Sequence, residues 1–82
     1  MFKMYYKVFV HESETEAYAV RVSAKDDAEI YNPLQAKMIA EMAQSLTGKD
    51  VTIAKITETE VYDFLTRQKM VHRVYEAVPM LV

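Results

Sequence analysis

The chain has 82 residues, of which 51% are apolar, and its formal net charge is −2. This near-neutral charge argues against a strongly basic nucleic-acid binder and against an acidic mimic of DNA. Cysteine is absent, which excludes disulfides, thiolate-bound zinc and a thiol nucleophile. We expect a single compact domain over residues 1–82, with a core so small that a second subunit is the expected source of additional stability.

The N-terminal part of the chain predicts a β-hairpin. Residues 2–11 alternate between two faces, and residues 16–24 repeat this period of two. Both segments are typical of half-buried antiparallel strands. The short acidic segment between them predicts a turn with Ser13 at its tip, which would place Phe9 opposite Ala17.

A charged loop is expected over residues 25–29, and a helix is expected after it. Asn32 suits the N-cap and Pro33 the first helical position, while Gln35 has the spacing of a capping box. Gly48, the only glycine, occupies the position of a C-terminal cap. Six apolar residues recur at helical spacing and are expected to form the buried stripe of this helix: Leu34, Met38, Ile39, Met42, Ala43 and Leu46.

A third strand and a second helix are expected in the C-terminal part. Val51 to Ile56 predicts a short strand, and the spacing of Thr57 and Glu60 predicts a capping box directly after it. Apolar residues then recur at intervals of three and four, so we expect a helix from residue 58 to about residue 77. The alternative ends this helix near residue 69 and makes residues 71–78 an edge strand.

These elements predict an α+β fold with the order ββαβα. It would have two layers, a three-stranded and mainly antiparallel sheet with two helices packed on one face. A right-handed crossover would place the third strand parallel to the second. The N-terminus lacks the pattern of a signal peptide, and no apolar stretch approaches the roughly 20 residues of a membrane span, so a cytoplasmic protein is expected.

The residues with catalytic or metal-binding chemistry are few. A single glycine excludes the glycine-rich loops that bind phosphates and dinucleotides. The two histidines, His11 and His72, cannot supply a three-histidine metal site. The glutamates beside His11 would alternate between the two faces of a hairpin, which favours an acidic, solvated turn. We therefore predict no catalytic residue, no metal and no cofactor.

The open face of the sheet is the most unusual predicted surface. It would carry an interaction face of basic and aromatic side chains, namely Lys3, Tyr5, Lys7, Phe9, His11 and Arg21. A secondary basic cluster on the second helix would extend the positive field, namely Arg67, Lys69, His72 and Arg73. An exposed aromatic face suits docking to a protein, including a second copy of the chain. Rings between basic groups also suit the stacking of single-stranded nucleic acid. The third interpretation of this face is an ordinary solvent-exposed surface.

Protein docking is the favoured function. Ala17 and Ala19 are small and apolar, and three glutamates at the end of the sheet weaken its positive field. We therefore predict a small non-catalytic protein-binding module that forms a homodimer. It would act as an inhibitor, adaptor or assembly factor, of the kind that bacterial viruses also encode. A nucleic-acid-binding module is the alternative, and no membrane partner is expected.

Overall fold

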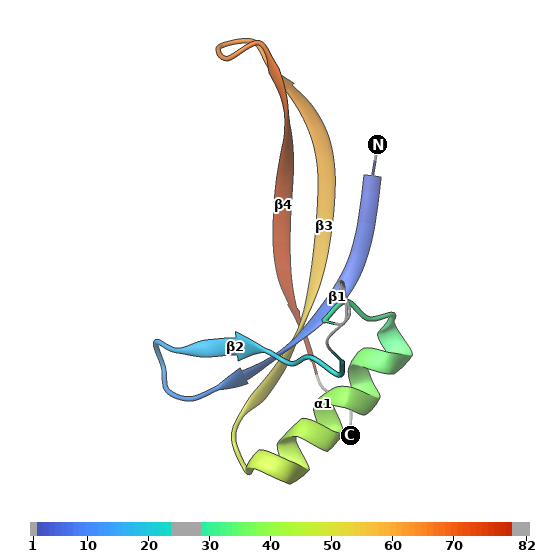
Figure 1. The fold of residues 1–82 in the computed structure, drawn as a ribbon, viewed down its shortest axis with the longest axis vertical. Coiled ribbons are helices and arrows are strands. Elements are labelled where there is room, and N and C mark those ends of the chain that lie inside the picture. Colours follow the sequence, from blue (N-terminus) through green and yellow to red (C-terminus); the bar gives the residue numbers. More distant parts are fainter. Residues whose placement is uncertain (1, 24–28, 80–82) are drawn as a thin grey trace.

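The computed structural model describes residues 2–23 and 29–79. Within them lie β1 (Phe2–His11), β2 (Ala17–Ala19), α1 (Pro33–Thr47), β3 (Val51–Asp63) and β4 (Gln68–Val78). The strands form one antiparallel sheet in the order β2-β1-β3-β4, and α1 packs against β1 and β3 (Figure 1). The predicted α+β class is confirmed, whereas the prediction of three strands and two helices was wrong. Residue 24 of the second predicted strand and residues 25–28 of the predicted loop lie outside the described residues.

The helix α1 begins and ends as the sequence predicts. The side-chain oxygen of Asn32 accepts the backbone N–H of Gln35 at 2.8 Å, and the side-chain oxygen of Gln35 accepts the backbone N–H of Asn32 at 3.1 Å. This completes the capping box, with Pro33 as the first helical residue. Gly48 ends the helix with a φ of 67°, a left-handed conformation that glycine adopts without steric cost. Among the described residues, no helix has the length and apolar content that crossing a membrane requires.

The helix packs through its alanines, and the predicted buried stripe was largely wrong. Ala36 and Ala40 are fully buried and Ala43 is nearly so. They belong to one core with Val8, Val10, Tyr31, Val51 and Ile53. Of the predicted stripe, Ile39 is half-buried, but four members are exposed, namely Leu34, Met38, Met42 and Leu46. Alanines let the helix backbone approach the sheet closely, which turns the larger side chains outward.

The predicted second helix was wrong, because its residues form the hairpin of β3 and β4. β3 continues through Thr57, where the helix was expected to begin, and β4 pairs with β3 from Asp63↔Gln68 to Ile53↔Val78. A turn over residues 64–67 joins them, and Asp63 accepts the backbone N–H of Leu65 at 2.8 Å. Many residues here are β-branched or aromatic, which favours strands over helix. The alternative prediction of an edge strand over residues 71–78 is confirmed, but the shortened second helix that was expected before this strand is part of β3 and its turn.

The predicted direction of the third strand is confirmed, whereas the predicted register of the N-terminal hairpin was wrong. β3 runs parallel to β2, but β1 lies between them and pairs antiparallel with both, with β3 from Phe2↔Thr59 to Val10↔Val51. β2 has only three residues and pairs with β1 in the register Phe9↔Ala19. This differs by two residues from the predicted register, because the backbone N–H groups of Glu12 and Ser13 both donate to the carbonyl of Glu16 and so lengthen the turn.

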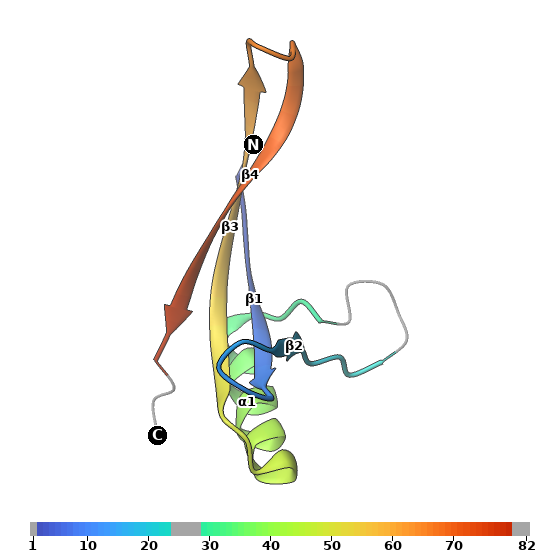
Figure 2. The same ribbon diagram turned by 90° about the vertical axis from the view of Figure 1, so that its left-hand side faces the viewer.

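The molecule is elongated. Its extents are 47 × 27 × 26 Å and its radius of gyration is 14.8 Å, whereas a compact domain of this length has a radius of about 12 Å. The difference comes from the β3–β4 hairpin, because β1 pairs with β3 only as far as Thr59. Beyond that residue the two strands continue alone, and we call residues 60–71 the arm (Figures 1 and 2).

Candidate functional site

The predicted interaction face of β1 lies on the side of the sheet away from α1. Its strand members alternate with the core residues Val8 and Val10 and are Lys3, Tyr5, Lys7, Phe9 and His11. Arg21 does not join them. It follows β2, donates its Nε to the carbonyl of Ser23 at 3.2 Å, and lines a groove beside α1.

Tyr5 is buried, with 9% of its surface exposed, and three charged groups surround it. Its hydroxyl donates to Oε2 of Glu58 at 2.7 Å, and Nε of Arg73 donates to the same oxygen at 2.9 Å. Nζ of Lys3 lies 5.4 Å from the centre of the Tyr5 ring. Burial first, and then the hydrogen bond to Glu58, raises the pKa of Tyr5. Tyr5 therefore contributes to packing and does not offer an open ring on which a base stacks.

The other polar groups of this face also have partners. Nζ of Lys7 lies 2.9 Å from Oε1 of Glu29, and this lysine lowers the pKa of Glu29. Nε2 of His11 lies 2.8 Å from the hydroxyl of Thr52. Lys7 and Arg73 are thus held by carboxylates, and Lys3 lies over the ring of Tyr5, which leaves little positive charge on this face for phosphates.

We predict that Glu58 makes folding stability depend on acidity. Its hydrogen bonds from Tyr5 first and then from Arg73 lower the pKa of Glu58 below its ordinary value of 4.5. A lowered pKa in the folded state means that the stabilisation is complete above pH 4.5 and is lost as the pH falls through the lowered value. Thermal unfolding between pH 7 and about pH 2.5 should therefore show a smaller acid-induced decrease in Tm for Glu58→Gln than for the natural chain.

The matched control for this experiment is Glu60→Gln, which changes an exposed glutamate two residues further along β3. This control variant should keep the acid dependence of the natural chain. An equal acid-induced decrease in the natural chain and in Glu58→Gln would contradict the assignment of this stabilisation to Glu58.

The structure does not bring the secondary basic cluster together. Arg67 lies in the turn of the hairpin, with a positive φ of 55°. Lys69 and Arg73 are two members of β4 on the face of Tyr5, whereas the alternation of the strand places His72 on the opposite face. The cluster was predicted on one helix, and the strand divides it between two faces.

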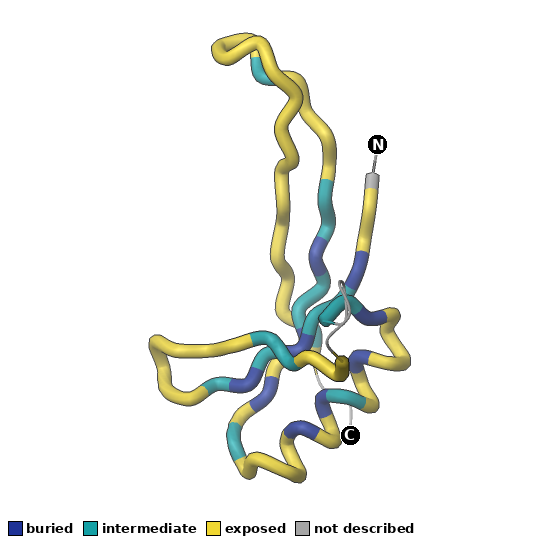
Figure 3. The backbone as a smooth tube through the Cα atoms, viewed as in Figure 1, coloured by how far each residue is buried: buried dark blue, intermediate teal, exposed yellow. Residues whose placement is uncertain are grey.

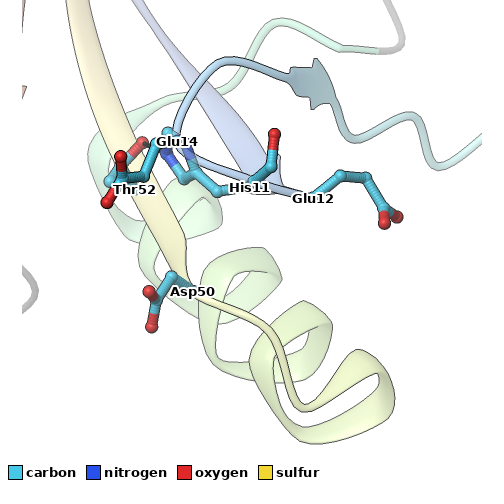
Figure 4. A pocket seen from close by; sticks show the side chains of 6 residues that line it. His11, Glu12, Glu14, Asp50 and Thr52 are labelled. Atoms are coloured by element: carbon cyan, nitrogen blue, oxygen red, sulfur yellow. Dashed lines mark hydrogen bonds between the residues drawn. The ribbon is translucent and has the colours of Figure 1, made fainter.

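An open hollow lies at the turn between β1 and β2. It is lined by His11, Glu12, Ser13, Glu14, Asp50 and Thr52, of which five are labelled in Figure 4. Glu12 and Asp50 point away from His11 (Figure 4). Glu12 instead accepts hydrogen bonds from Lys49 and Tyr18. Among the described residues, no three His, Asp or Glu side chains lie together as a metal site requires. The described residues that line the hollow all have polar side chains.

The arm exposes apolar side chains on both of its faces and at its tip. Phe64 and Leu65 in the turn are 84% and 95% exposed. The rings of Tyr62 and Phe64 lie edge to face with their centres 5.2 Å apart. Exposed apolar neighbours continue along the strands, namely Val61, Met70 and Val71. Most of the projecting hairpin is coloured as exposed in Figure 3. Such a concentration of exposed apolar groups is typical of an interaction site.

The arm lies within the segment that was predicted to form the second helix. A signal for the hairpin was nevertheless present, because Thr57, Thr59 and Val61 are β-branched residues that alternate with glutamates. The helix-start signal of Thr57 and Glu60 outweighed this alternation in the prediction.

Comparisons with known proteins add no assignment to these surfaces. No protein-family model, no curated protein and no solved structure matches the chain significantly. Function is therefore inferred from the surfaces of the molecule itself.

Proposed function

We propose that the chain is a small non-catalytic protein-binding module that inserts its arm into a cleft of another protein. The observation that supports this is the exposure of Phe64 and Leu65 at the end of the arm. Large apolar side chains at the tip of the arm are far from the core of their own chain. They are removed from water when they enter an apolar pocket of another protein, which is favourable. Inhibitors, adaptors and assembly factors all act by docking of this kind.

The dimensions of the arm suit insertion. The four residues of β3 beyond Thr59 extend about 14 Å from the end of β1 at the rise of an antiparallel strand. The cross-strand pairs Glu60↔Val71 and Val61↔Met70 hold the two strands in register. A backbone that is already ordered loses less conformational entropy on binding than a flexible loop does.

The charges near the tip indicate the chemistry of the partner. Arg67 and Lys69 are exposed, whereas Oδ1 of Asp63 accepts the backbone N–H groups of Leu65 and Thr66 within the turn. The tip thus presents apolar groups beside two cationic groups. We infer a partner whose cleft is apolar at its base and acidic at its rim.

The nucleic-acid alternative has less support. On the predicted interaction face of β1, stacking requires an exposed ring, and Tyr5 is buried there with its hydroxyl bonded to Glu58. Lys7 and Arg73 are paired with carboxylates, so each would have to exchange a protein partner for a phosphate.

The double variant Phe64→Ser/Leu65→Ser tests the role of the arm. Burial of each of these side chains contributes about 1.5–3 kcal/mol, so binding to the partner should weaken at least about 100-fold. A partner captured with the natural chain would be purified, and its affinity for both proteins measured by titration calorimetry.

Val74→Ser is the matched control, because Val74 is also an exposed apolar residue of the β3–β4 hairpin but lies outside the arm. It should bind the captured partner as the natural chain does. A purified partner that binds the double variant with unchanged affinity would disprove insertion of the arm.

A further inference from the structure

The outer face of α1 carries a row of large apolar side chains that no described residue covers. Leu34, Met38, Met42 and Leu46 follow one another at intervals of four, and they are 51–80% exposed. Residues at this spacing lie along one side of a helix. Val22 lines two grooves beside this row, together with Ile39. We call these four helix residues the outer row.

The outer row has the same order in both directions, Leu-Met-Met-Leu. In a two-fold interface, if residue i of one subunit contacts residue j of the other, then residue j of the first subunit also contacts residue i of the other. Two antiparallel copies of α1 that cross between Met38 and Met42 would place Leu34 against Leu46 of the second copy. Met38 would likewise meet Met42 of the second copy. Every apolar side chain of the row would then have an apolar partner.

The charges beside the outer row fit the same arrangement. Lys37 and Glu41 are exposed on the side of the row away from the grooves, and neither forms an ion pair with a described residue. In the antiparallel pair, a two-fold axis brings the same flanks of both helices together. Lys37 of one copy then lies beside Glu41 of the other, twice in the dimer, so the two flanks attract each other.

We propose that α1 is a homodimerisation surface, on which the α1 of a second copy of this chain lies antiparallel. This proposal does not depend on the function proposed for the arm. α1 lies at the end of the molecule opposite to the tip of the arm, so a dimer of this kind leaves both tips exposed (Figure 1).

Light scattering after size-exclusion chromatography measures the mass that tests this proposal. At micromolar concentration the natural chain should have about twice the 9.5 kDa of the monomer. Met42→Lys should be a monomer with an unchanged helix signal in circular dichroism, because it places a charge at the centre of the row. Phe64→Ser/Leu65→Ser should remain a dimer. A monomeric natural chain, or a Met42→Lys variant that still dimerises, would overturn the proposal.

Reversal of the two flanking charges tests the antiparallel direction. Lys37→Glu would face Glu41 of the second copy with a like charge, and Glu41→Lys would do the same to Lys37. Each single variant should raise the dimer dissociation constant at least tenfold. The double variant Lys37→Glu/Glu41→Lys should restore it, because the pairs are then exchanged. Single variants without effect, or a double variant that does not recover, would overturn the antiparallel pairing.

Discussion

Replacement of Ile56 by alanine should destabilise the fold by about 2–5 kcal/mol. Ile56 is fully buried in the middle of β3, where it faces away from α1 between Tyr5 of β1 and Tyr75 of β4. The shorter side chain would leave a cavity on β3. The flanking strands β1 and β4 cannot move in to fill it, because they are hydrogen-bonded to β3. Because small domains have about 5 kcal/mol in total, this loss should leave the variant with only about 0–3 kcal/mol of stability at 25 °C.

Urea unfolding followed by circular dichroism measures this loss. Leu65→Ala is the control, since it removes a similar volume from a side chain that is 95% exposed, and it should change stability by less than about 0.5 kcal/mol. Equal midpoints for Ile56→Ala and Leu65→Ala would show that Ile56 is not packed as described.

Enlargement of Ala40 to leucine should destabilise the fold by about 1–3 kcal/mol. Ala40 is fully buried in the core between α1 and the sheet. The helix would have to move away from β1 and β3, and the contacts of Ala36 and Ala43 would weaken with it. Leucine and alanine both favour helix, so the loss would come from packing and not from helix propensity.

Thermal unfolding of Ala40→Leu would be compared with that of Gln44→Leu, a substitution at an exposed position of the same helix. Only the former should have a lowered Tm. A Tm of Ala40→Leu equal to or above that of the natural chain would mean that α1 does not pack through its alanines.

The parts of the fold with strong local signals were predictable. The strict alternation of residues 2–11 is a short-range property, and β1 begins and ends at the expected residues. The caps of α1 involve residues at most four positions apart, so Asn32, Pro33 and Gly48 predicted both ends of the helix. Val51 as the first residue of β3 follows from the same kind of signal.

Other parts depend on contacts that a local pattern does not contain. Valines and aromatic residues after Thr57 fit a period of 3.6 as well as a strand, and pairing with β4 decided between them. Apolar side chains occupy several sides of α1, so their spacing alone could not predict that the helix packs on the sheet through Ala36, Ala40 and Ala43. The role of Tyr5 required Glu58, which lies 53 residues later in the sequence. The candidate site was therefore only partly predictable, and the arm was missed.

The strand order has a consequence for how the chain folds. β1 ends at His11 and β3 begins at Val51, so their pairing closes a long loop before any core exists. The alanines of α1 contact both strands, so the helix has no surface on which to dock until that loop is closed. The β3–β4 hairpin closes only a short turn, but a two-stranded ribbon is barely stable alone in water. Folding should thus depend on one late, cooperative event that brings β1, β3 and α1 together, with the β3–β4 hairpin as its template.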